Sequence, residues 1–416
     1  ATGGVITVND PASTIYGLSI SIPAGALLAN TTIHISELLS PPTLGGTPRF
    51  LLKGFSVEPD GTLLAALATV TLPYSTSEFN SREGIPLERF LGTYFLDTST
   101  GSVKGLASFS VDPANHVVTG SVSHFSAYYV TNYARLCPPP TAESDCPSTA
   151  PAPSPKIPAI FVNGFQIPFG SGMGDESTWR QLRYLLNRLD LQGSGHIDAF
   201  RFDWDSAYTH FELSAGGLAA AIVKVKEDTA QGFVNLVAHS FGGILVRTYL
   251  QNQADFGRTK FQFDVNRVMT LGTPHQGIGG IFSTISANIC ATASQTIQPL
   301  TCFEVNTGDP RIDGEGNFLR HLNGLDVPPF LSSAPLLPKL QSDVSPQYYI
   351  IRGQLLSKQL VTELVPDDGL ITLAGSEPCP VGHPQLCKSD VLTEIIASSE
   401  TDAVGLCHTG ELFKLY

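Results

Sequence analysis

The chain has 416 residues and a formal net charge of −13 at pH 7, with 24 Lys and Arg against 37 Asp and Glu. This length exceeds what one ordinary hydrophobic core supports, so we expect two domains. The acidic balance gives no electrostatic reason for binding nucleic acid or an anionic membrane surface. No apolar run approaches the roughly 20 residues that a transmembrane helix needs.

Residues 1–135 consist of short segments that often alternate apolar with polar residues, separated by turns such as Pro-Asp-Gly and Asp-Pro-Ala-Asn. This spacing predicts an antiparallel β-sandwich. The segments GLSISIPAGALLANTTIHIS and SHFSAYYV resemble the β-sandwich domain named for zonula occludens and uncoordinated proteins. That resemblance implies an accessory module for structure or interaction, in which His116 and His124 have structural roles.

Residues 136–156 are rich in Pro, Ser and Ala and predict a semi-rigid, extended linker. From Ile157 onward, apolar strands alternate with helical stretches, which predicts a mostly parallel sheet with helices on both faces. The first of these helices is expected to place its large apolar residues on one face. They are Trp179, Leu182, Leu185, Leu186 and Leu189.

The segment NLVAHSFGGILVRTYL places Ser240 between an apolar strand, 233–239, and an amphipathic helix. A turn this tight strains the serine backbone and requires small flanking residues, which Ala238 and Gly242 supply. Such a turn exposes the hydroxyl above the sheet edge, next to the N–H groups of a helix start. We therefore expect Ser240 to be a nucleophile.

Two further strings accompany this elbow, Asn163-Gly164-Phe165 and Thr270–Gly277 (TLGTPHQG). Together the three strings resemble the lipase/esterase branch of the α/β-hydrolase family, over residues 157–416. The resemblance implies that the backbone N–H groups of Phe165 and Phe241 form the oxyanion hole. Asn163 departs from the His-Gly pair of many hydrolases, which puts in question the hydrogen bonding that shapes this loop.

The same resemblance implies the chain order nucleophile, acid, histidine. The string Asp368-Gly369-Leu370-Ile371 matches the Asp-Gly-Leu-Val of bacterial lipases, so Asp368 is the favoured acid and its neighbour Asp367 the alternative. His408 follows the last expected strand and is the favoured base. His383, between two cysteines, is the alternative. His239 and His275 are expected to be structural.

Residues 277–346 form an insertion without strand pattern, far longer than the usual loop of about 4–6 residues. We interpret it as a cap or lid over Ser240, suited to a hydrophobic ester; a rigid subdomain is the alternative. The catalytic domain is thus 157–416 with a cap at about 277–346. The sequence indicates no cofactor and no metal.

Six of the seven cysteines form local couples separated by 9, 12 and 8 positions. This spacing predicts the disulfides Cys137–Cys146, Cys290–Cys302 and Cys379–Cys387, with Cys407 left over. Disulfides indicate an oxidising compartment. The start at Ala1, without Met or a basic and apolar leader, is what a mature form without its signal peptide would show, so we expect a secreted protein.

The sequence therefore predicts a secreted serine hydrolase, a lipase or esterase, that cleaves carboxylic esters through Ser240, Asp368 and His408. Its expected partner is a hydrophobic ester, at a lipid or polymer interface. Two alternatives remain open: a polyester depolymerase, and a non-catalytic binding protein with a degenerate hydrolase domain.

Overall fold

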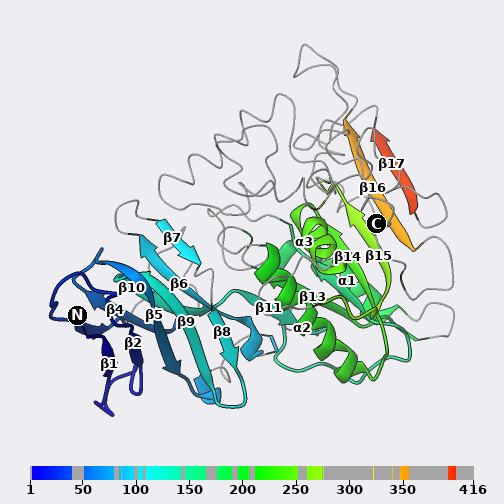
Figure 1. Ribbon diagram of the computed structural model, residues 1–416. Helices are drawn as coiled ribbons and strands as arrows, with labels where there is room; N and C mark the ends of the chain where they lie inside the picture. Colours follow the sequence, from blue (N-terminus) through cyan, green and yellow to red (C-terminus); the bar gives the residue numbers. More distant parts are fainter. Residues whose placement is uncertain are drawn as a thin grey trace.

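The computed structural model shows a β-sandwich and a larger α/β unit (Figure 1). The residues that the structure describes are 2–39, 51–78, 84–85, 87–97, 102–105, 109–141, 146–164, 176–189, 195–204, 206, 211–251, 260–273, 275, 322, 340, 347–355 and 392–399. Within these residues, no helix has both the length and the apolar character to span a bilayer.

The N-terminal strands form two antiparallel five-stranded sheets, as the alternating pattern predicts. One sheet has the order β1 (Gly4–Thr7), β2 (Ser19–Ile22), β5 (Leu63–Pro73), β9 (Val117–His124) and β8 (Phe109–Asp112). The other has the order β3 (His34–Glu37), β4 (Leu51–Glu58), β10 (Ala127–Asn132), β6 (Leu91–Asp97) and β7 (Ser102–Gly105). Buried side chains of both sheets, among them Val70, Val118 and Tyr128, form one core.

The second unit is built on a seven-stranded sheet. Its order is β11 (Ala134–Cys137), β13 (Ala199–Trp204), β12 (Ala159–Val162), β14 (Val234–His239), β15 (Val265–Leu271), β16 (Tyr348–Leu355) and β17 (Leu392–Ser399). All neighbours pair in parallel except β11 and β13, which are antiparallel. This is the α/β architecture expected from the alternation of strands and helices.

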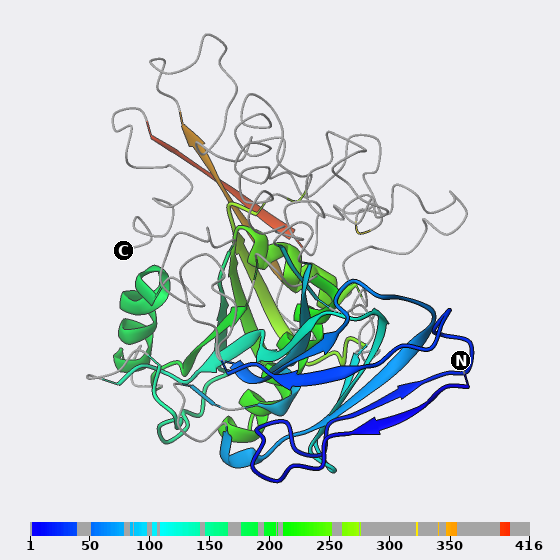
Figure 2. The same cartoon turned by 90° about the vertical axis from the view of Figure 1, so that its left-hand side faces the viewer.

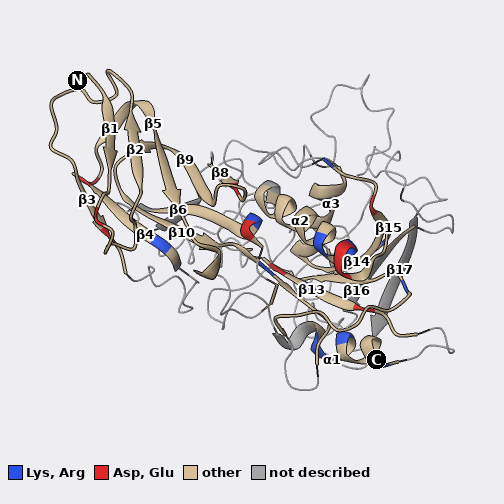
Figure 3. Ribbon diagram, turned by 90° about the horizontal axis from the view of Figure 1, so that it is seen from below, with Lys and Arg blue, Asp and Glu red and all other residues tan. Residues whose placement is uncertain are grey.

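Helices cover both faces of this sheet because its central strands are apolar on both sides. Ile160 and Val162 of β12 pack with α2 (Phe211–Thr229) and α3 (Phe241–Leu250). The intervening Phe161 packs instead with Trp179 of α1 (Glu176–Arg188), on the opposite face. Figure 3 shows α1 on one side of the sheet and α2 and α3 on the other.

The apolar face of α1 is narrower than its sequence predicts. Trp179 is buried, and Leu182 and Leu186 pack beside it. Leu185 and Leu189, by contrast, are 39% and 46% exposed. A helix on the outside of a sheet buries only the stripe that contacts the strands, so residues one or two positions off that stripe face solvent.

The sandwich has its own core, but some of its side chains also pack into the hydrophobic core of the α/β unit. Phe90, in the short turn Glu88–Phe90, lies 5.9 Å from Phe202 of β13, ring centre to ring centre. The Tyr133 hydroxyl donates to the Arg89 carbonyl, 2.9 Å away. The domain boundary expected at residue 135 falls inside β11, which continues directly from the sandwich into the edge of the large sheet. In Figure 1 the sandwich accordingly lies on the β11 and β13 side of the large sheet, and Figure 2 views the molecule from the sandwich side.

Candidate active site

Ser240 lies between the end of β14 and the start of α3, with φ 52° and ψ −127°. This combination has a positive φ, which residues other than glycine rarely adopt. Its backbone N–H donates to the Leu271 carbonyl at 2.9 Å, and its own carbonyl accepts from Gly243 N–H at 3.0 Å. These two bonds connect the strained residue to β15 on one side and to α3 on the other.

Glycines make the close packing around Ser240 feasible. A Cβ on Gly164 would lie 2.7 Å from the Cβ of Ser240. A Cβ on Gly242 would lie 2.6 Å from the Asn163 carbonyl oxygen, and one on Gly243 would lie 2.1 Å from Thr273 Oγ1. The strand end at 163–164 and the start of α3 are therefore nearly in backbone contact, as a nucleophile elbow requires.

The start of α3 provides the electrostatic part of the site. Phe241 is the first residue of the helix and directly follows Ser240, and the first turn contains no acidic residue. Free backbone N–H groups and the positive end of the helix dipole favour negative charge at this position. The Phe241 ring is buried and packs 6.1 Å from the Phe211 ring, ring centre to ring centre. This arrangement fits the expected oxyanion donor at Phe241.

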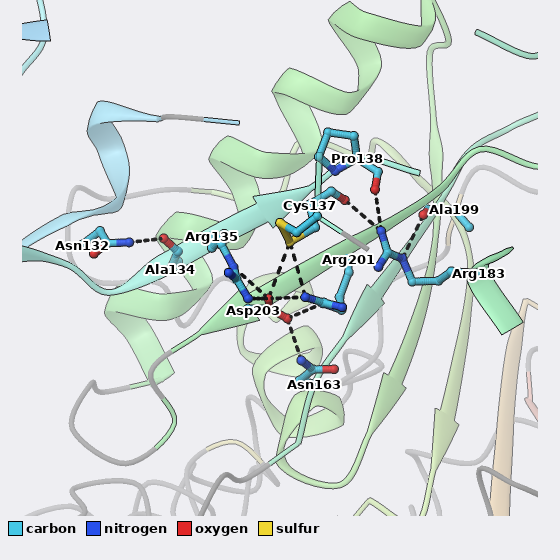
Figure 4. Close-up of a disulfide and its surroundings, with 11 residues drawn as sticks. Asn132, Ala134, Arg135, Cys137, Pro138, Asn163, Arg183, Ala199, Arg201 and Asp203 are labelled. Carbon is cyan, nitrogen blue, oxygen red and sulfur yellow. Dashed lines mark hydrogen bonds and ion pairs between the residues drawn. A yellow bond between two sulfur atoms is a disulfide. The ribbon is translucent and has the colours of Figure 1, made fainter. Parts of the chain in front are cut away.

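Asn163, which departs from the family pattern, makes well-defined contacts. Its Nδ2 donates to Asp203 Oδ1 at 2.6 Å (Figure 4). Its backbone carbonyl accepts from Trp204 Nε1 at 2.8 Å. Sequence reasoning missed Asp203, because the residue lies 40 positions away on β13. Its only signal was a pair of opposite charges, Arg201 and Asp203, within an otherwise apolar strand, the segment AFRFDW.

The two histidines near the elbow have structural contacts, in agreement with their expected roles. His239 is 8% exposed, and its ring lies edge-on to Trp179 at 6.5 Å between centres. His275 is buried, with Nε2 3.3 Å from Thr270 Oγ1 and Nδ1 3.4 Å from an Arg247 nitrogen. Burial lowers the pKa of the Arg247 guanidinium to about 10.

Several predicted residues lie outside the part of the chain that the structure describes. They are Phe165, Asp368, His408, Cys290, Cys302, Cys379 and Cys387. The cap at 277–346 is also outside it, apart from Leu322 and Leu340, which are buried. The Cys137–Cys146 disulfide is present, with Cα atoms 4.7 Å apart.

The strand order and the elbow define the class of this unit, which is an α/β-hydrolase fold. A family model described as palmitoyl protein thioesterase matches residues 169–309, about a third of the chain. The match supports a hydrolase of ester or thioester bonds. The predicted resemblance of the sandwich stays a prediction.

Among solved structures, the mature lipase of Bacillus licheniformis is 16% identical, with a TM-score of 0.39, over 67% of this chain and 92% of that one. A gene product of Listeria innocua is 15% identical, with a TM-score of 0.32, over 63% and 92%. No match is found among curated proteins. The fold follows from the strand order and the elbow, not from these low-scoring alignments.

Proposed function

We propose that the protein is a secreted serine hydrolase that cleaves carboxylic esters with a hydrophobic acyl group. The observation that carries this proposal is the backbone of Ser240, φ 52° and ψ −127°, at the junction of β14 and α3. Strain of this kind costs about 1–3 kcal/mol and persists where function requires it. At the end of a central strand, it lifts a hydroxyl out of the sheet.

The reaction follows from the proposed roles. Ser240 Oγ attacks the carbonyl carbon as His408 accepts its proton, and Asp368 orients the imidazole and stabilises its charged form. The N–H groups of Phe165 and Phe241 donate to the oxyanion. His408 then gives that proton to the ester oxygen as its bond to the carbonyl carbon breaks, so that it leaves as the alcohol, and water hydrolyses the acyl-enzyme by the same steps.

A thioester is the second candidate substrate, because the matching family model describes a thioesterase of palmitoyl proteins. The same nucleophile and oxyanion hole serve both reactions, since both pass through a tetrahedral intermediate. The two substrates differ in the leaving group, which is a thiolate or an alkoxide. An alkoxide depends more strongly on protonation by His408, because its conjugate acid is much weaker than a thiol.

The uncharged strands and exposed leucines of the sandwich support the proposal that the protein acts at a hydrophobic ester surface, made of lipid or polymer. Strands β1, β2 and β5 carry no charged residue, as Figure 3 shows. Leu28 is 91% exposed, Leu63 77% and Leu67 58%. The Cys137–Cys146 disulfide supports the extracytoplasmic location, because such bonds persist in oxidising compartments.

The first experiment compares p-nitrophenyl esters and acyl thioesters of increasing chain length, with emulsified triglyceride and polyester film as further substrates. We expect turnover that rises with acyl length and falls by several orders of magnitude in Ser240→Ala. Ser214→Ala is the matched control, since Ser214 is also a buried serine but belongs to α2 and not to the elbow. Activity that survives in Ser240→Ala would contradict the proposal, and inactive wild type would favour a binding protein.

Matched neighbours test the acid and the base. Asp368→Asn and His408→Ala should lower kcat by about 10³-fold or more. Asp367→Asn and His383→Ala are the matched controls, because they change the same residue types in the same part of the chain. They should leave kcat within about threefold, since the catalytic roles are assigned to Asp368 and His408. The reverse pattern would transfer the roles to Asp367 or His383.

A further inference from the structure

A buried ionic network lies on the β13 side of the elbow. The Asp203 carboxylate is fully buried and accepts hydrogen bonds from two guanidinium groups. Arg201 donates to its two oxygens at 2.8 and 3.0 Å, and Arg135 donates at 2.9 and 3.1 Å. Figure 4 shows the three side chains meeting beside the Cys137–Cys146 disulfide. The two guanidinium groups therefore fix the position of the carboxylate in addition to the backbone of Asp203.

Asn163 is the third residue that donates to this carboxylate, and its amide forms the fifth of these hydrogen bonds. A carboxylate only accepts hydrogen bonds, so the NH2 group of Asn163 and not its oxygen must face Asp203. That bond is 2.6 Å long, and the Asn163 residue is 3% exposed. The Asn163 Oδ1 atom has no hydrogen-bond partner among the described residues. The contact with Asp203 therefore determines how the amide is oriented.

The backbone of Asn163 is fixed as well. Its carbonyl accepts from the Trp204 indole at 2.8 Å, so β13 holds both its side chain and its main chain. The same carbonyl oxygen lies 2.6 Å from where a Gly242 Cβ would be, and a Cβ on Gly164 would lie 2.7 Å from the Cβ of Ser240. A displacement of residue 163 is transmitted to the backbone on which the nucleophile packs.

We propose that Asn163 and Asp203 form a positioning pair that sets the 163–164 backbone for stabilisation of the oxyanion. This inference rests on the proposed function and names what takes the place of the histidine in the His-Gly pair, whose glycine is present as Gly164. Neither residue touches substrate; each acts through the main chain of the loop. What the pair needs from residue 163 is an N–H donor aimed at Asp203.

The test uses the full chain and a p-nitrophenyl ester, with active enzyme counted by fluorophosphonate titration. Asn163→Ala removes the donor, and Asn163→His restores one, because its Nδ1–H occupies about the place of the amide N–H. Asn266→Ala is the matched control: Asn266 also donates its amide N–H, at 2.8 Å to Asn235 Oδ1, but near the opposite end of β14 from Ser240. Circular dichroism verifies the fold of each variant.

We expect Asn163→Ala to lower kcat by about 10- to 100-fold with KM within about twofold, the pattern of a misplaced oxyanion donor. Asn163→His should regain most of kcat, and Asn266→Ala should match wild type. If Asn163→Ala fails to fold, Asn163→Thr is used instead. The Thr hydroxyl lies one bond closer to the backbone than the Asn amide nitrogen, so the donor is drawn back from Asp203.

An unchanged kcat in folded Asn163→Ala would overturn the inference, as would a histidine variant as impaired as the alanine one. Both results leave an active wild type and hence an intact proposed function. A wild type that neither hydrolyses the ester nor reacts with the fluorophosphonate would overturn the proposed function, and the inference with it.

Discussion

Ser240 combines a reactive hydroxyl with a backbone that prefers glycine. Its φ of 52° is imposed from both sides, by the hydrogen bonds to Leu271 and Gly243. A residue with no Cβ would occupy the same conformation without strain. The serine thus occupies this position at a cost in stability, as expected of a catalytic side chain at a sharp turn.

This strain gives a prediction at the scale of one residue. Ser240→Gly and Ser240→Ala should both be inactive, but the glycine variant should have the higher free energy of unfolding, by about 1 kcal/mol. Alanine keeps the Cβ that the conformation disfavours, whereas glycine relieves the strain and loses only some backbone entropy. Denaturant titration of both variants measures the difference, and a glycine variant no more stable than the alanine one would mean that Ser240 is unstrained.

At the scale of elements, the elbow depends on a strand end and a helix start in backbone contact. Gly242 faces the carbonyls of Val162 and Asn163, at 2.7 and 2.6 Å from its would-be Cβ. Both atoms belong to main chain that other bonds restrain. An added methyl group therefore displaces α3 or the 163–164 segment rather than a side chain.

Gly242→Ala should lower the free energy of unfolding by about 2 kcal/mol, through overpacking. It should also slow ester hydrolysis by at least about tenfold, because it moves the oxyanion donors. Gly232→Ala is the control, since Gly232 precedes β14 and a Cβ there meets nothing within 4 Å. If Gly242→Ala matched Gly232→Ala in stability and kcat, the backbone contact would not exist in solution.

The sequence is sufficient to predict the elements that carry local patterns. The elbow can be predicted from the sequence because small residues must flank Ser240. The central strands can be predicted because they are continuously apolar. The pairing of β11 with β13 cannot be predicted from local sequence, because the partner of this short antiparallel edge strand lies more than 60 positions away. The Asp203 network is hidden for the same reason: its members come from β11, from β13 and from the end of β12.

At the scale of the molecule, the sandwich is part of the hydrolase and not a tethered module. Phe90 and Tyr133 enter the core that α2 and β13 build. Tyr133 also packs against α2 so closely that a Cβ on Gly217 would lie 2.9 Å from its ring. The sandwich and the hydrolase should therefore unfold in one transition, since most of the shared core would be exposed together.

Phe90→Ala should lower the free energy of unfolding by about 3–5 kcal/mol, the cost of a large cavity in a core. Leu28→Ala, at a residue 91% exposed, should change it by no more than about 0.5 kcal/mol. Calorimetry of both variants and of wild type measures these values. Two separate transitions in wild type, with only the first lowered by Phe90→Ala, would show that the domains are independent.

The central claim is that Ser240 is the nucleophile of a hydrolase. It is tested most directly by reaction with a fluorophosphonate, followed by intact mass and peptide mapping. The account predicts one phosphonyl group per chain on the peptide that contains Ser240, none in Ser240→Ala and full reaction in Ser214→Ala. A folded wild type that stays unmodified, or a modification that persists in Ser240→Ala, would contradict it.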